Sequence, residues 1–153
     1  MSVAEKLSKF DELAREYRCI TSSLLERLLD LEDVLTEEIL VSNQITNEKL
    51  LEKFDFKGYG FRFCGSNQGR YLHLVVLNDG IYKIIPPALK NIGRGFNYHG
   101  QYGYYFEYWD RKEILTFIKI LPEFLENMIN VLQDEITINK EKYIVLQKML
   151  DNI

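Results

Sequence analysis

The chain has few of the features that mark secreted, metal-binding or membrane proteins. Its 153 residues include two cysteines, Cys19 and Cys64, which form neither a disulfide framework nor a metal-ligand spacing. No apolar run approaches the roughly 18–20 residues of a membrane span, and the first residues lack the basic start and apolar stretch of a secretory signal. We therefore expect a cytoplasmic protein with reduced thiols, no membrane span, no metal and no cofactor.

Glycine is missing from both ends of the chain. All nine glycines lie between Gly58 and Gly103, and 13 of the 20 aromatic residues lie between Tyr59 and Trp109. Because glycine supplies turns and aromatic residues favour strands, the middle of the chain is expected to be β structure. Residues 57–112 also carry eight Lys or Arg against three Asp or Glu, whereas the remainder is acidic. This pattern predicts a basic, aromatic head between two acidic arms.

The first arm has the apolar periodicity of a long helix. Its apolar residues recur every three or four positions, at Val3, Leu7, Phe10, Leu13, Tyr17, Ile20, Leu24, Leu28, Leu31, Leu35 and Ile39. This spacing places them on one stripe. Ser2 and Glu5 form a capping-box signature at its start. The weak helix formers at 20–23 leave a break near 19–23 open, and Thr46 is expected to cap a short helix over 47–54.

The second arm is predicted to begin at Asp110, which precedes Glu113 by three residues and opens a second apolar stripe. Pro122 interrupts this stripe, so it is expected to kink the helix or to restart it. A turn at 137–139 is expected to separate a last helix.

The middle of the chain predicts an antiparallel hairpin. A turn at 66–69 pairs Cys64 with Tyr71 and Arg62 with His73, which places Phe61, Phe63, Leu72 and Leu74 on the core face. The tight-turn signal at 78–80 predicts a third strand at 81–85, followed by one helical turn at 88–92. A further hairpin tip at 97–101 leads into a last strand at 103–109.

Together these elements predict a single-domain α+β protein. Helical arms at 1–56 and 110–153 are expected to pack antiparallel, as in a coiled coil, around an inserted antiparallel sheet of three to five strands in a head at 57–109. The arms carry more apolar surface than one chain needs, which favours a homo-oligomer through the helices. The alternative is that an intramolecular core uses the whole stripe.

The first functional hypothesis is a non-enzymatic head that binds single-stranded nucleic acid or a nucleotide. Cations along the phosphates and flat rings under the bases are what such ligands require. The candidate ligand-binding residues are Arg62, Arg70, Tyr71, His73, Arg94, Phe96, Tyr98, Tyr104 and Arg111. No dinucleotide or P-loop fingerprint is present, and an isoelectric point near 5.3 argues against bulk duplex binding.

Two other classes of function compete with this hypothesis. Tyrosine, tryptophan and arginine also anchor protein interfaces, so the same head would suit an inhibitor or an adaptor that grips another protein. A small enzyme using His73 or His99 is the third possibility. Cys64 is the other candidate and is expected to share a face with His73, but Arg62 is expected opposite His73. The turn explains Asp79 and the helix cap explains Asp110, so no catalytic residue is assigned.

Overall fold

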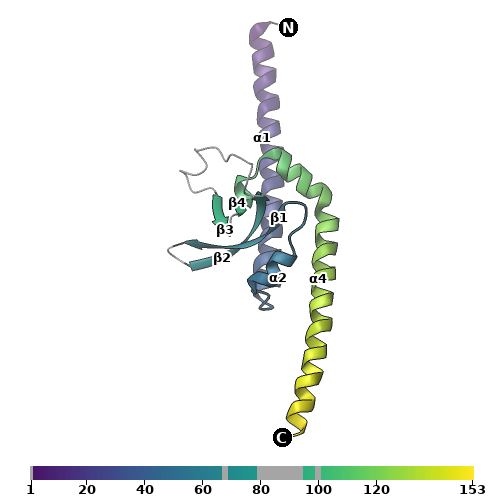
Figure 1. Cartoon of the computed structure of the whole chain (residues 1–153). Helices are drawn as coiled ribbons and strands as arrows, with labels where there is room; N and C mark the ends of the chain where they lie inside the picture. The colour runs from purple at the N-terminus through teal and green to yellow at the C-terminus, as the bar shows by residue number, and fades with distance from the viewer. Residues whose placement is uncertain (1, 67–68, 79–94, 99–100) are drawn as a thin grey trace. The chain divides into compact units, whose positions relative to one another are not determined.

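The structure of the chain, a computed structural model, describes residues 2–66, 69–78, 95–98 and 101–153 (Figure 1). It confirms the α+β class, with a long helix at each end and an antiparallel sheet inserted between them. The chain divides into two compact units, residues 1–44 and 45–153. The predicted antiparallel packing of the arms stays a prediction.

The first unit is a single helical rod. Helix α1 (Val3–Asp33) begins at the predicted capping box, in which the Ser2 side chain accepts from the Glu5 amide and the Glu5 carboxylate accepts from the Ser2 amide. The helix runs through 19–23 without a break, so the weak local propensity there is overridden by the residues on either side. A π-helical segment, η1 (Val34–Val41), follows directly.

The second unit opens with the short helix α2 (Glu48–Lys53). Its cap is Asn47, not the predicted Thr46: the Asn47 side chain accepts from the amides of Lys49 and Leu50. Asparagine ranks above threonine as a helix cap, which agrees with the use of Asn47 in place of its neighbour Thr46. A two-residue turn then leads into the sheet, and Lys57 and Gly58 at its centre both have positive φ (50° and 86°). A two-residue turn with positive φ at both central residues matches the right-handed twist of the chain segments that it joins.

The described sheet has four antiparallel strands in the order β1-β2-β4-β3: β1 (Tyr59–Ser66), β2 (Gly69–Asn78), β4 (Gln101–Tyr105) and β3 (Gly95–Tyr98). The β1–β2 register is the predicted one, with Cys64 opposite Tyr71 and Arg62 opposite His73. Strand β4 ends at Tyr105, and residues 106–108 form a 3-10 turn, η2. The predicted strand at 103–109 was therefore too long. The strand predicted at 81–85 and the helical turn at 88–92 lie outside the described residues.

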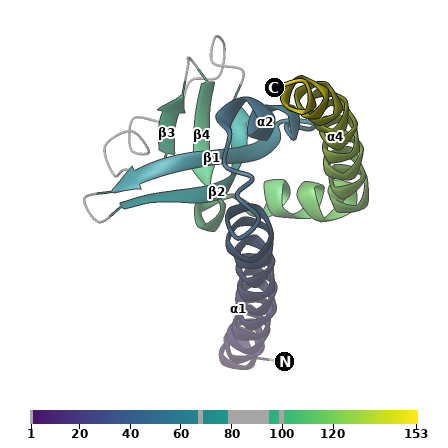
Figure 2. The same cartoon turned by 90° about the horizontal axis from the view of Figure 1, so that it is seen from below.

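Helix α4 (Arg111–Asp151) is continuous, so the predicted turn at 137–139 is absent. Asp110 caps it by accepting from the Glu113 amide at 2.7 Å. Pro122 lies inside the helix, which changes direction along its first half (Figure 2). This agrees with the predicted kink, because proline removes one helical hydrogen bond and crowds the preceding turn.

The core of the second unit lies between α4 and one face of the sheet. Phe61 meets Phe124 at a ring separation of 5.9 Å, and Tyr59 meets Phe117 at 5.1 Å. Phe117 also contacts Phe106 and Trp109, which follow the last strand. These ring contacts make α4 the cover of this face, called here the helix face.

We predict that Phe117→Ala destabilises the protein by about 3–5 kcal/mol, because the ring is fully buried and its removal leaves a cavity. Leu115→Ala, in the same turn but 42% exposed, is the matched control and is expected to cost no more than about 1 kcal/mol. Urea denaturation followed by circular dichroism measures both. Equal losses would contradict this account of the core.

Candidate binding face of the sheet

The opposite side of the sheet carries a continuous set of aromatic side chains. Strand alternation and the observed registers place five ring-bearing side chains on this side: Tyr71, His73, Phe96, Tyr98 and Tyr105. We call this side the aromatic face. Four of the predicted site residues, Tyr71, His73, Phe96 and Tyr98, therefore share one surface, whereas Tyr105 was not among the predicted set.

Tyr105 lies at the centre of this group. Its ring is 5.1 Å from that of His73, 5.7 Å from that of Phe96 and 6.3 Å from that of Tyr108. Burial raises the pKa of Tyr105, and the neighbouring Cys64 thiol raises it further. The rings are half-buried and Tyr71 is 47% exposed. The result is an aromatic platform of packed rings that are partly exposed.

An ion pair with a buried arginine lies on the same face as the rings. The Arg62 guanidinium is 3% exposed and binds both carboxylate oxygens of Asp55, at 3.0 and 2.7 Å. It also donates to the Gln101 side chain at 3.0 Å and lies 5.2 Å from the centre of the Tyr98 ring. Burial raises the pKa of Asp55, and the pairing with Arg62 opposes that rise.

These contacts curl the sheet toward the aromatic face. Arg62 belongs to β1, whereas Tyr98 and Gln101 belong to β3 and β4, and these strands are not its neighbours in the strand order. Side chains from the two ends of the sheet therefore meet across this face. The Tyr98 hydroxyl donates to Glu48 of α2 at 2.6 Å, and this bond raises the pKa of Tyr98 to about 12.

Of the four predicted phosphate-binding arginines, the structure describes three, and these three lie in different surroundings. Arg62 is buried against Asp55. Arg70 lies by alternation on the helix-face side, where it stacks on Phe63 and pairs with Glu48. Arg111 is exposed in the first turn of α4, and Arg94 lies outside the described residues.

The observed strand registers also show on which face of the sheet Tyr104, His73 and Cys64 lie. Tyr104 pairs with Val76 and lies on the helix face, away from the other predicted rings. His73 and Cys64 share the aromatic face, as expected, and Arg62 stands opposite His73. His99 lies outside the described residues. Within the described part of the chain, no group of three or more His, Cys, Asp or Glu side chains is arranged to hold a metal ion.

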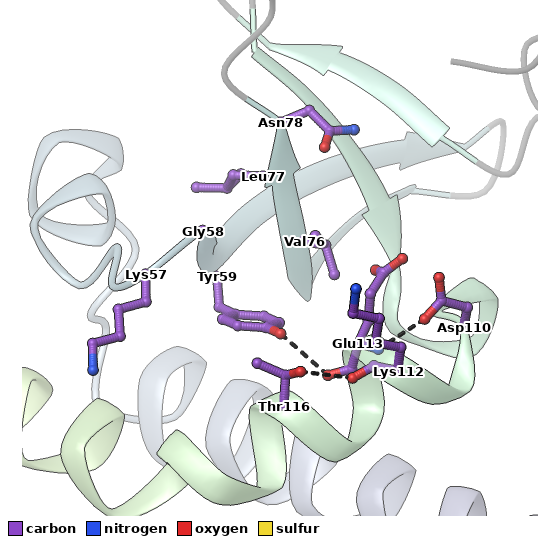
Figure 3. A pocket seen from close by; sticks show the side chains of 10 residues that line it. All are labelled: Lys57, Gly58, Tyr59, Val76, Leu77, Asn78, Asp110, Lys112, Glu113 and Thr116. Atoms are coloured by element: carbon purple, nitrogen blue, oxygen red, sulfur yellow. Dashed lines mark hydrogen bonds between the residues drawn. The ribbon is translucent and has the colours of Figure 1, made fainter. Parts of the chain in front are cut away.

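A separate pocket lies where the start of α4 meets the ends of β1 and β2 (Figure 3). Its volume is about 330 Å³, which is at the small end of the range for ligand sites. The Tyr59 hydroxyl donates across it to the Glu113 carbonyl at 3.1 Å. Two lysines, Lys57 and Lys112, and two acids, Asp110 and Glu113, line it, so its formal charges balance. None of the nine predicted ligand-binding residues is in this lining.

Comparison with protein-family models, with curated proteins and with solved structures finds no match to this chain. No helix in the described part of the chain has the length and apolar character needed to cross a membrane.

We predict that Gly60→Ala disrupts the platform. A Cβ atom at this position would lie 2.0 Å from the Asp55 carboxylate, in the space that lets Asp55 reach Arg62. Losing the pairing of a buried arginine, together with the overlap itself, is expected to cost about 2–4 kcal/mol. The unfolding midpoint in urea measures the loss.

Gly65→Ala is the matched control in the same strand, since a Cβ atom there meets nothing within 4 Å. Its unfolding free energy is expected to stay within about 0.5 kcal/mol of that of the parent protein. If the two variants were equally stable, Asp55 would not be held in place as described.

Proposed function

We propose that this chain is a non-enzymatic, cytoplasmic protein-binding module whose aromatic face holds a partner protein. The observation that carries the proposal is an accessible cluster of rings on a face that has no uncompensated cation on its described strands. Centres of protein interfaces are enriched in aromatic residues and depleted of charge. Nucleic-acid interfaces are instead strongly positive.

The geometry of the rings also supports this function. Tyrosine offers a large contact area and a hydroxyl group while losing little conformational freedom on binding. Tyr105 already packs against its neighbours His73 and Phe96 in the folded protein. These rings therefore lose little further side-chain entropy when a partner binds. A preorganised face of this kind suits an adaptor or an inhibitor that binds one surface of its target.

The test is photocrosslinking in the cells that make the protein, with a photoreactive phenylalanine analogue at Tyr71. Tyr71 is 47% exposed on the aromatic face. We expect a discrete adduct that protease degrades and nuclease does not. The analogue at Leu115, 42% exposed on α4, is the control and should give no such adduct. Tyr105→Ala should remove the adduct, whereas Tyr105→Phe should keep it. Equal labelling from both positions would refute the proposal.

Binding of single-stranded nucleic acid or a nucleotide is the second candidate. The observation in its favour is that Tyr71, His73, Phe96 and Tyr105 share one face, where bases are able to stack. Two of the arginines predicted to contact phosphate, Arg62 and Arg70, are already paired with Asp55 and Glu48, which weakens this candidate. A nuclease-sensitive adduct in the crosslinking experiment would favour it over the protein partner.

Fluorescence anisotropy with a labelled mixed-sequence single-stranded oligonucleotide separates the two candidates in solution. We expect no binding tighter than about 100 µM at physiological salt, because Arg62 and Arg70, the arginines on the described strands, already pair with Asp55 and Glu48 and so release few counterions. Micromolar binding that weakens steeply with salt and is lost in Tyr71→Ala would instead establish the nucleic-acid function. Tyr17→Ala, at a tyrosine of α1 with a similar exposed fraction of 51%, is the control.

A further inference from the structure

The last part of α4 exposes an apolar seam. Residues 137–153 are exposed along their whole length, and Figure 1 shows this end of α4 running past the sheet. The exposed fractions include 45% for Ile136, 66% for Tyr143, 56% for Leu146 and 63% for Leu150. A helix segment with this much apolar surface needs a second surface to cover it.

The seam has the spacing of a two-stranded coiled coil. Ile129, Ile136, Tyr143 and Leu150 are each seven residues apart, and Leu132, Asn139 and Leu146 form a second seven-residue series three positions later. In heptad notation the first series occupies the a positions and the second the d positions. Isoleucine at a with leucine at d, as in the first heptad, favours parallel dimers.

From this arrangement we infer that α4 forms a parallel, in-register coiled coil with a second copy of the chain over residues 129–151. This inference does not rest on the proposed function of the aromatic face. The first argument for a second copy is Asn139, the one polar residue in the a and d series. In a parallel, in-register pair each Asn139 faces the other, so the two amides can hydrogen-bond inside the seam. A lone asparagine at an a position is known to fix register, and we extend this argument to Asn139 at its d position, where the two amides face each other in the same way.

Charge complementarity at the edges of the seam is the second argument. Glu135 occupies a g position and Lys140 the following e position, and in a parallel dimer these two positions meet across the interface. Lys53 of the same chain binds Oε1 of Glu135. A carboxylate accepts several hydrogen bonds, so Oε2 can accept from Lys140 of the second copy. The pairing occurs twice by symmetry.

The available area is the third argument. Six apolar side chains per helix lie in the a and d series, and side chains of this size remove roughly 60–120 Å² each from water. Twelve of them bury about 700–1,400 Å², and the stems of the flanking e and g residues add to this. The total reaches the range of about 1,200–2,000 Å² found for stable interfaces.

The apolar surface is wider than the seam in the last turns. Ile138 and Val145 occupy c positions, Ile144 a b position, and all three are exposed. They lie outside a two-stranded interface, which makes them suitable control positions. A larger bundle, or coverage of the seam by α1, would use them, so the oligomeric mass is part of the test.

Two variants of the full chain test the seam. Leu146 and Ile144 are exposed to a similar degree, 56% and 53%, and only Leu146 belongs to the a and d series. We expect the parent protein to elute with twice the 18.1 kDa of the chain in size-exclusion chromatography with light scattering. Leu146→Asp should weaken dimerisation by about 100-fold or more, because it places two facing carboxylates in the seam. Ile144→Asp should leave the dimer unchanged.

Disulfide trapping tests the orientation. In a background with the exposed Cys19 replaced by serine, Leu146→Cys should form an interchain disulfide on mild oxidation, because facing d positions of a parallel pair come within disulfide reach. Glu141→Cys, on the outer f position, should not. A monomeric parent, an assembly larger than a dimer, or a dimer that fails to trap at position 146 would each overturn the inference. Circular dichroism of each variant is the control that checks whether its helix content is unchanged.

Discussion

The buried pair of Arg62 and Asp55 is the interaction on which the head depends. A guanidinium that is 3% exposed must be matched by a carboxylate and by hydrogen bonds, and Asp55, Gln101 and the Phe61 carbonyl supply them. These partners come from the segment after α2, from β4 and from β1 itself. The pair therefore connects both ends of the sheet to the segment that precedes the sheet. The absence of a side chain at Gly60 leaves space for the Asp55 carboxylate in this contact.

The same pair decides the chemistry of the aromatic face. An arginine on a strand beside tyrosines is, from its sequence position alone, a candidate for phosphate binding. In the structure Asp55 compensates the charge of Arg62, and the Tyr98 ring lies against an arginine that is already paired. Glu48 has a comparable effect at the edge, where it pairs with Arg70 and accepts from Tyr98. The acidic residues that moderate the basic head come from residues 48–55, just ahead of it in the sequence.

Local patterns were sufficient to predict much of the fold. The β1–β2 register followed from the turn and from strand alternation, because a slip by one residue would have moved Phe61 and Leu74 off the core face. The caps at Ser2 and Asp110 followed from side chains that satisfy the first amides of a helix. The end of β4 did not follow, since alternation of aromatic residues continues to Trp109 while the backbone turns at Phe106.

The composition of the site was less accessible to prediction than the fold. Which face Tyr104 occupies depends on the β2–β4 register, and these two strands are far apart in the sequence, with β3 between them, so no single tight turn joins them and sets it. The partner of Arg62 lies seven residues away across the turn at Lys57 and Gly58, whose positive φ values bring the segment back over β1. The alternation of apolar and polar residues along the sequence does not predict a contact of this kind. Tyr105 was missed for the same reason, because its importance comes from three ring neighbours on three different elements.

Dimerisation through α4 would strengthen binding by the aromatic face. A single face built from a few rings binds with modest affinity, because association must first offset the loss of translational and rotational freedom. Two heads joined by a helical seam would engage a dimeric or repetitive partner with a second contact that is intramolecular, which raises the overall affinity without any new contact on either face. This gain requires the heads to be held at a fixed separation, and a continuous helix such as α4 is stiffer than a flexible linker. The unbroken run from Arg111 to Asp151 is therefore consistent with a role in which the seam joins two aromatic faces at a defined spacing.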